Sequence, residues 1–191
     1  MNGAYLCIEL VKKDIMATTW KLDPTHSEVA FKVKHLVITT VTGYFRSFDG
    51  TVVTENEDDF TTGKVDFTID TTSIDTNQAQ RDEHLKSADF FDAANQPQIT
   101  FSSTSIEEKG SDEFVLRGDL TIGGTTKPVK FDVEFGGTVT DPYGNFKAGF
   151  EVSGKISRKE FGLTWSAVTE AGAVVVSDDV KIQASVQFVK Q

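Results

Sequence analysis

The sequence predicts an all-β fold with one helix. Apolar and polar residues alternate along most of the chain from Trp20 to Phe188, which is the period of strands with one buried face. Turn-forming stretches rich in Gly, Asp and Asn separate the alternating runs. Only the segment 77–101 contains a helical pattern, and that pattern ends before Pro97. A closed barrel and a two-sheet sandwich both satisfy these observations, and periodicity does not separate them.

The alternating runs predict about eight or nine strands. They lie at residues 29–35, 41–53, 64–70, 99–102, 114–122, 129–135, 146–156, 161–165 and 180–188. The alternation breaks at residues 45–48, as a β-bulge at a barrel rim would break it. Small residues on the inward faces leave room between the larger ones and favour a cavity; these are Gly118, Ala148, Gly154 and Ala184.

The helical stretch places four residues on one face, within about 100° of one another: Arg81, His84, Leu85 and Ala88. On the other face Asp82 and Lys86 are spaced for an ion pair. Asn77 is the expected N-cap, and Pro97 closes the stretch. Two interpretations stay open. The helix is an ordinary lid whose Arg81 and His84 form surface pairs, or a lid that turns both side chains toward a cavity mouth.

Composition narrows the function classes. The 191 residues fit one domain, and the formal charge of −10 argues against nucleic acid or an anionic membrane surface as the main partner. Fifteen phenylalanines indicate much apolar surface, either in a packed core or along a pocket. Cys7 is the only cysteine, so no intrachain disulfide forms.

Residues 1–17 lack the alternation and are expected to be an extension outside the fold, for which a misread start is one explanation, with the barrel at 18–191. The apolar stretch AYLCIEL contains Glu9, and Lys12 and Lys13 follow it instead of preceding it, so it does not resemble a secretory signal. A cytoplasmic location is therefore expected. No stretch approaches the ~20 apolar residues of a membrane span.

Searches for catalytic and metal motifs find no nucleophile elbow, phosphate loop or paired ligand spacing. The spacing of the three histidines carries no metal signature, so no metal site is expected. His35 shares the inward parity of its strand and is either a core histidine or a polar group in a pocket. His26, in the turn-like DPTHS, is expected to bond a backbone group. Arg158 is either a surface arginine or an inward one.

The chain carries, in order, WKLDPTHSEVAFKVKHL, RDEHLKSADFFD with PQITF, GDLTIGGTTKPV, SRKEFGLTW and AGAVVVSDDVKI. Together these stretches resemble the YceI-like family of lipocalin-like, polyisoprenoid-binding proteins, from about residue 19 to 190. The resemblance implies an eight-stranded antiparallel lipocalin-like barrel with a short helix near one end. It also implies a tunnel that holds an isoprenoid lipid, such as an isoprenoid quinone or a polyprenyl phosphate. Many relatives carry a secretory signal, which is not seen here.

We therefore expect non-enzymatic binding, transport or storage of an isoprenoid lipid, with no catalytic residue and no cofactor besides the lipid. The expected tunnel residues are Phe31, Val33, His35, Phe45, Phe67, Ile69, Leu85, Phe90, Phe91, Phe101, Leu116, Leu120, Phe131, Val133, Phe150, Ile156, Leu163 and Trp165. The expected head-group residues are Arg81, His84 and Arg158.

Two alternatives remain. One is an enzyme that acts on a lipid head group through His35 or His84, and the other is a structural or interaction barrel with a solid core. As partners, no nucleic acid is expected. A transient membrane or enzyme partner for lipid exchange, and a homodimer, stay open.

Overall fold

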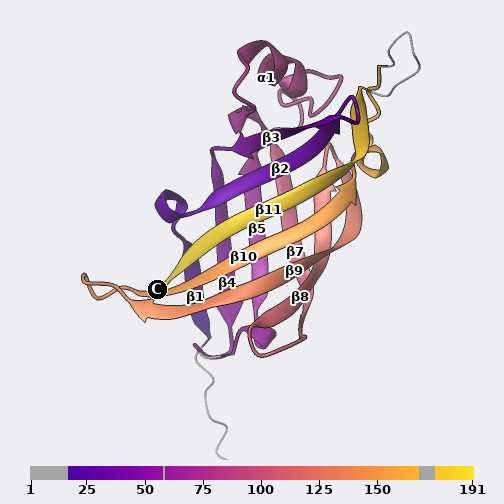
Figure 1. Ribbon diagram of the computed structural model, residues 1–191. Coiled ribbons are helices and arrows are strands. Elements are labelled where there is room, and N and C mark those ends of the chain that lie inside the picture. Colours follow the sequence, from indigo (N-terminus) through magenta and orange to yellow (C-terminus); the bar gives the residue numbers. More distant parts are fainter. Residues whose placement is uncertain (1–16, 58, 168–174) are drawn as a thin grey trace, which may run out of the picture.

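The computed structural model describes residues 17–57, 59–167 and 175–191, whose strands form one antiparallel sheet (Figure 1). The strands are β1 (Thr18–Leu22), β2 (Glu28–His35), β3 (Thr39–Phe45), β4 (Phe48–Thr54), β5 (Lys64–Asp70), β6 (Ile74–Asp75), β7 (Gln98–Glu108), β8 (Glu113–Ile122), β9 (Thr125–Thr140), β10 (Phe146–Ser157) and β11 (Val176–Lys190). The helical elements are η1 (Pro24–His26), η2 (Phe60–Thr62), η3 (Thr71–Ser73), α1 (Ala79–Lys86) and η4 (Arg158–Phe161).

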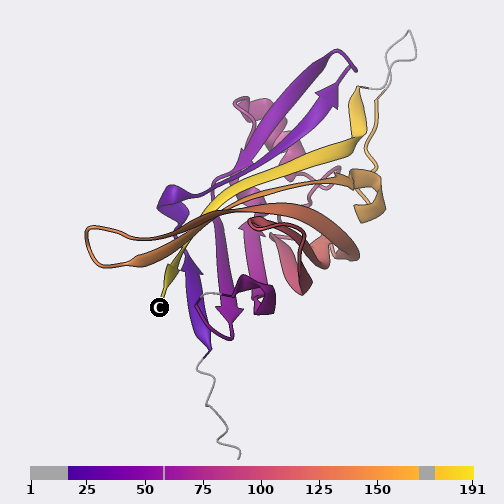
Figure 2. The same ribbon diagram turned by 60° about the horizontal axis from the view of Figure 1, so that its bottom comes forward.

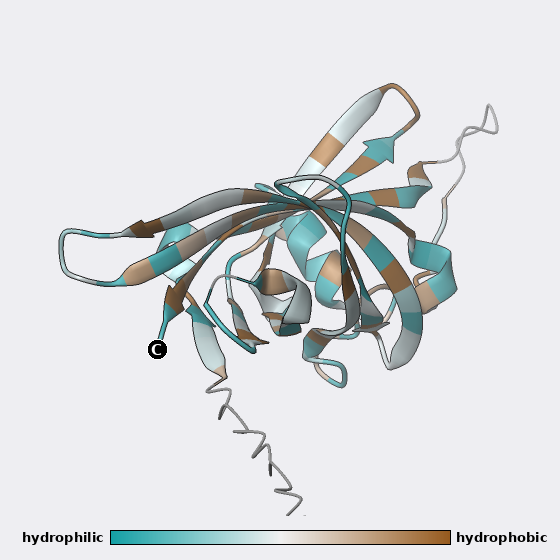
Figure 3. Cartoon of the chain, turned by 90° about the horizontal axis from the view of Figure 1, so that it is seen from below, coloured by the Kyte–Doolittle hydropathy of each residue, from teal (hydrophilic) through white to brown (hydrophobic). Residues whose placement is uncertain are grey.

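Within the described residues, eight strands close a ring in the order β1-β4-β5-β7-β8-β9-β10-β11, because β11 pairs back with β1. Closure leaves no unpaired edge in this ring. The structure is thus an eight-stranded antiparallel barrel with one short helix, which confirms the predicted fold class and decides against the sandwich. Seen from below, apolar and polar segments alternate along the strands (Figure 3).

Strand β11 has two partners along one of its edges. Its last residues pair with β1, where Phe188 faces Leu22. The part of β11 from Val176 to Ser185 pairs with β2, where Ile182 faces Phe31. β1 and β2 therefore share one position in the barrel wall. Beyond β2 lie β3 and the short β6, so the β2–β3 hairpin extends away from the closed ring (Figure 2).

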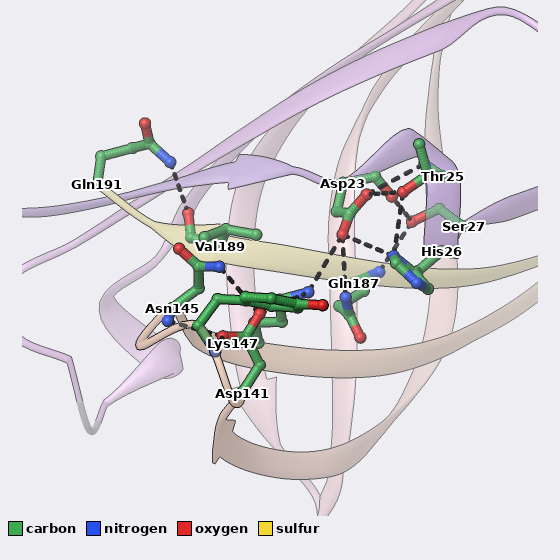
Figure 4. Close-up of polar contacts among 11 residues, drawn as sticks. Asp23, Thr25, His26, Ser27, Asp141, Asn145, Lys147, Gln187, Val189 and Gln191 are labelled. Carbon is green, nitrogen blue, oxygen red and sulfur yellow. Dashed lines mark hydrogen bonds and ion pairs between the residues drawn. The ribbon is translucent and has the colours of Figure 1, made fainter.

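The turn η1 fills the gap between β1 and β2 and is bonded to β11. Asp23 N donates to the Gln187 carbonyl at 2.8 Å, and Gln187 N donates to Ser27 Oγ at 2.9 Å. The Asp23 carboxylate accepts from His26 Nδ1 at 2.8 Å and from Lys147 Nζ at 3.4 Å (Figure 4). The prediction that His26 bonds a backbone group is wrong, because its imidazole is hydrogen-bonded to the side chain of Asp23, the N-cap of η1.

Two of the predicted strands need correction. Residues 41–53 form the latter part of β3 and nearly all of β4, with a break between the two strands. At the break, Arg46 N donates to the Ser73 carbonyl and not to a neighbouring strand. Residues 161–165 form no strand. Gly162 has a left-handed φ of 81°, and the Arg158 guanidinium takes the carbonyls of Leu163 and Trp165.

Helix α1 lies over one end of the barrel (Figure 1). Its N-cap is Gln78, whose side chain accepts from Arg81 N. The predicted cap, Asn77, is wrong by one residue and adopts a positive φ of 61°. None of the helices within the described ranges has the length and apolar character needed to span a bilayer.

The predicted pair of Asp82 with Lys86 is also wrong. Lys86 Nζ lies 3.0 Å from Glu83 Oε1. Asp82 turns toward the start of the helix, where its carboxylate accepts from Thr76 N at 2.9 Å. An acidic side chain at this end satisfies a free backbone N–H and favours the helix dipole.

Candidate functional site

The barrel encloses a large apolar cavity. Its volume, counted as the space open to the centre of a water molecule, is about 260 Å³. Its lining reaches from Phe60 of η2 at one end of the barrel to Leu85 of α1 at the other. Every lining residue among those the structure describes is apolar except Arg158. Packed protein interiors hold few voids larger than a water molecule, so the phenylalanines do not form a solid core here.

Phenylalanine rings lie against the barrel wall where the neighbouring strand has a glycine. A Cβ atom on Gly43 would sit 2.2 Å from Cζ of Phe31, and one on Gly154 would sit 2.5 Å from Cδ1 of Phe131. Gly50 and Gly118 stand in the same relation to Phe67 and Phe101. The rings thus occupy the space that the missing side chains leave, and the centre of the barrel stays open. The sequence predicted open space at Gly118 and Gly154, but in the structure the rings of Phe101 and Phe131 fill that space.

An aromatic cluster closes the end of the barrel away from α1. Trp20 is fully buried, and its ring centroid lies 5.2 Å from that of Phe60. The Phe60 ring also contacts Phe135 and Phe150, at 5.4 and 5.0 Å between centroids. Trp20 Nε1 donates to Thr54 Oγ1 at 3.3 Å, which satisfies the one polar group of the indole. The α1 end is therefore the candidate mouth.

Side chains from two distant segments cover this mouth. Leu85 of α1 and the following Phe90 and Phe91 line the cavity. The Trp165 ring, in the loop after η4, lies 5.1 Å from the His84 ring and 5.2 Å from the Phe90 ring, between centroids. We call His84, Phe90 and Trp165 the lid contact. It joins the α1 segment to the opposite part of the rim.

Arg158 is buried at the mouth, with 4% of its surface exposed. Its Nε donates to the Ser177 carbonyl at 3.0 Å and its Nη2 to the Val176 carbonyl at 3.3 Å. Its Nη1 donates to the carbonyls of Leu163 and Trp165. A guanidinium has five N–H donors, so within the described part of the chain these four carbonyls leave one donor on Nη2. The arginine thus holds the loop after η4 to the start of β11.

Burial lowers the pKa of Arg158, and the charge of nearby Asp178 opposes this effect. An arginine keeps its proton in proteins even so, because its reference pKa is far above neutrality. Among the residues that the structure describes, the cavity therefore has hydrocarbon walls and the fixed positive charge of Arg158 near its mouth. The choice that the sequence left open for Arg158 is decided for the inward, buried position.

The structure places the other two predicted head-group residues outside the lining. Arg81 is exposed, and its guanidinium donates to Thr76, at 2.7 Å to Oγ1 and 2.6 Å to the carbonyl. His84 Nε2 lies 3.0 Å from Asp89 Oδ2, and its ring belongs to the lid contact. Both side chains are thus engaged with the protein itself, and a role toward a ligand stays a prediction.

All predicted tunnel residues line the cavity except His35 and Trp165. His35 ends β2 beyond the lining residue Val33, and Trp165 packs above Phe90. Further lining residues were not named from the sequence, although the alternation marks most of them. These are Val29, Ala30, Val52, Phe60, Val65, Ile99, Ile106, Phe114, Ile122, Val152, Val176, Val180, Ile182, Ala184, Val186 and Phe188. Phe60 carried no signal because it lies in a turn.

The three histidines are separated in the fold, with His26 in η1, His35 at the end of β2 and His84 in α1. In the part of the chain that the structure describes, no three His, Cys, Asp or Glu side chains are grouped to hold a metal ion. Cys7 and the rest of residues 1–16 lie outside the described residues, so the expected extension stays a prediction.

A closed eight-stranded ring, an apolar interior and a helix over one end define a lipocalin-like barrel. The chain belongs to the YceI-like domain family, which matches residues 20–188. It is 43% identical over 178 residues to Protein YceI of Escherichia coli O157:H7, which covers 92% of this chain and 89% of that protein.

Two solved structures share the fold. The crystal structure of Burkholderia cenocepacia BcnA superposes with a TM-score of 0.75 at 24% identity, over 87% of this chain and 98% of that one. A polyisoprenoid binding domain from Saccharophagus degradans, implicated in plant cell wall breakdown, superposes with a TM-score of 0.64 at 15% identity, over 90% of this chain and 98% of that one. At these identities the likeness concerns the fold alone.

Proposed function

We propose that this protein is a non-enzymatic carrier or store for an isoprenoid lipid, such as an isoprenoid quinone or a polyprenyl phosphate. The observation that carries the proposal is the large apolar cavity, closed at one end and covered by a lid at the other. The polyisoprenoid binding domain from S. degradans uses the same barrel, which supports the choice of ligand class.

The lining favours binding over chemistry, because its described side chains are hydrocarbon apart from that of Arg158. Burial is worth about 0.8 kcal/mol per methylene, so each five-carbon prenyl unit gains roughly 3–4 kcal/mol before costs. A tail of several units would exceed the practical limit of noncovalent affinity on this count, so ordering and reorganisation must offset much of the sum. Such walls discriminate tails mainly by length and width.

Selectivity must then come from the head group at the mouth. The Arg158 guanidinium lines the cavity there, and its remaining Nη2 donor suits an oxygen of a quinone or a phosphate. The proposal needs no cofactor besides the lipid itself.

The test is ligand uptake by delipidated protein. Addition of a polyprenyl quinone at about 100 times its Kd should raise the free energy of unfolding by about 2.7 kcal/mol. The variant Ala184→Phe puts a ring on a cavity-lining position of β11 and should lose this effect. Its matched control is Gln183→Phe, the exposed neighbour on the outer face, which should keep it. Equal uptake by both variants, or no stabilisation by either ligand class, would contradict the proposal.

A further inference from the structure

The tip of the β2–β3 hairpin, which we define as Leu36, Val37 and Ile38, breaks the usual rules of turn chemistry. Leu36 and Val37 have positive φ angles of 51° and 65°. Two successive residues with positive φ in a hairpin turn are typically Asn, Asp or Gly, because a side-chain Cβ is strained there. A β-branched valine is among the least suited residues. The backbone of this turn is therefore strained, and the side chains at its tip are not the ones that would relieve the strain.

The three side chains are apolar, and those of Val37 and Ile38 face solvent. Val37 is 72% exposed and Ile38 is 80% exposed. The hairpin extends away from the barrel, at the same end of the molecule as α1 (Figures 1 and 2). Large apolar side chains placed together on such a projection favour transfer into an apolar phase.

The tip is continuous with the mouth of the cavity. Val33 of β2 and Val176 of β11 both line the cavity, and His35 pairs with Val176 in the sheet. Leu36 N donates to the Val175 carbonyl at 2.9 Å, which fixes the base of the tip to the start of β11. An apolar phase that contacted the tip would therefore lie a few residues away from the lining.

The charge around the tip is opposite to that of the whole chain. Residues 29–48 contain no acidic residue, whereas the full sequence has a net charge of −10. Lys34 is exposed on this hairpin, and Lys32 lies on the same face of β2. Of the acids on the neighbouring strand, Asp179 pairs with Lys155 at 2.8 Å, and Asp178 accepts from Lys159 N at 3.1 Å. Charges further away are screened beyond about 8 Å at physiological salt.

We propose that the tip docks on a lipid bilayer that contains anionic lipids, with Val37 and Ile38 in the interface and the lysines near the head groups. Such docking would bring the α1 mouth to the membrane, where an isoprenoid lipid resides. This purpose rests on the proposed carrier function, but the docking itself is measured without it.

The test measures partitioning of the full chain onto phosphatidylcholine vesicles with about 30 mol% phosphatidylglycerol, by flotation. The variant Leu36→Asn/Val37→Gly/Ile38→Thr gives the turn its favoured residues and removes the apolar side chains. Its thermal midpoint should stay equal or rise, while vesicle partitioning should fall at least ~10-fold. The matched control is Val139→Thr/Tyr143→Ser, which removes side chains that are 61% and 90% exposed on the β9–β10 hairpin. It should partition like the parent protein.

A second variant separates charge from apolar contact. Lys34→Glu should weaken binding to the anionic vesicles by several-fold and leave binding to pure phosphatidylcholine unchanged. The docking proposal would be overturned by any of three results. The tip variant could partition as well as the parent protein, both hairpin variants could lose partitioning equally, or the parent protein itself could fail to float with the vesicles. A tip variant that changed the sedimentation mass instead would overturn it in favour of a second copy as the occupant.

Failure of the carrier function gives a different pattern. Delipidated tip variant should take up detergent-solubilised prenyl quinone as the parent protein does, because the cavity is untouched and this loading needs no membrane. If the protein bound vesicles through the tip but never held an isoprenoid lipid, the docking proposal would stand. Only the carrier function would be overturned.

Discussion

The imidazole of His84 and the indole of Trp165 meet edge to face, with ring centroids 5.1 Å apart and an angle of 88° between the planes. His84 belongs to α1, and Trp165 lies in the loop that Arg158 holds to β11. This contact joins the two segments that cover the mouth. In the proposed carrier, it must open whenever a ligand enters or leaves.

Removal of the indole should accelerate ligand exchange. Aromatic pairs contribute about 0.5–1.5 kcal/mol each, so Trp165→Ala, which deletes the contacts with His84 and Phe90, should raise the rate of lipid transfer to acceptor vesicles roughly 10-fold. Stopped-flow transfer of a fluorescent prenyl quinone measures this rate. Tyr143→Ala removes an aromatic ring that is 90% exposed and should leave the rate unchanged. An unaltered rate for Trp165→Ala would argue against a lid.

Replacement of the buried arginine should destabilise the fold. Arg158→Leu leaves four backbone carbonyls without their donor, and we expect a loss of about 3 kcal/mol or more in the free energy of unfolding. Urea denaturation measures it. Lys159→Leu, at the exposed neighbouring position, is the control and should change stability little. A loss below about 1 kcal/mol for Arg158→Leu would mean that the guanidinium does not hold the rim together.

The glycine under Phe131 should control the size of the cavity. Gly154→Ala places a Cβ 2.5 Å from the ring and forces the ring toward the centre. We expect a loss of about 1–3 kcal/mol in stability and a lower stoichiometry of bound lipid. The double variant Gly154→Ala/Phe131→Leu should recover both. Gly149→Ala is the control on the same strand, because no described residue lies within 4 Å of its Cβ position. Unchanged lipid content in Gly154→Ala would show that the ring has another place to go.

Stability should fall in acid because of the carboxylates between β9–β10 and η1 (Figure 4). Hydrogen bonds, first from the Asn145 side chain and also from Lys147, lower the pKa of Asp141 to about 2. Burial alone would raise the pKa of Asp23, but hydrogen bonds from neighbouring side chains, Lys147 among them, outweigh it and hold that pKa well below its usual value. A carboxylate whose pKa is lower in the folded protein than in the unfolded chain stabilises the fold at pH values above its unfolded-state pKa, near 3.9. This stabilisation is lost as the pH falls toward the pKa of the folded state.

We therefore expect the urea midpoint to drop between about pH 5 and pH 2. The variant Asp141→Asn should have a lower midpoint at neutral pH and a flatter dependence across this interval. Asp119→Asn, at an exposed position of β8, should keep the dependence of the parent protein. Parallel curves for the parent protein and Asp141→Asn would contradict the role of Asp141.

The alternation was enough to predict the strand faces, because burial of one face imposes a period of two on every wall of a barrel. It placed Phe131 and Val133 correctly in the lining. It could not predict that the Phe131 ring covers Gly154, because that relation depends on the register between two strands and on closure of the ring. The size of the cavity depends on such relations and was therefore beyond the sequence.

The rim was the least predictable part, because its backbone is bonded by side chains and not by neighbouring strands. Arg158 takes the carbonyls of the stretch predicted as a strand at 161–165, and no periodicity signals such an arrangement. Likewise, Val37 and Ile38 continued the apolar character of β2 and did not stand out, because only the φ angles and the exposure reveal a strained projecting turn.

The central claim is that the cavity holds an isoprenoid lipid, and the most direct measurement is organic-solvent extraction of the natively purified protein followed by mass spectrometry. We predict a polyprenyl species close to one molecule per chain, whose head group the same spectrum identifies, and its loss in Ala184→Phe but not in Gln183→Phe. The claim would be contradicted if the extract contained no polyprenyl species and if neither added isoprenoid quinone nor added polyprenyl phosphate stabilised the protein.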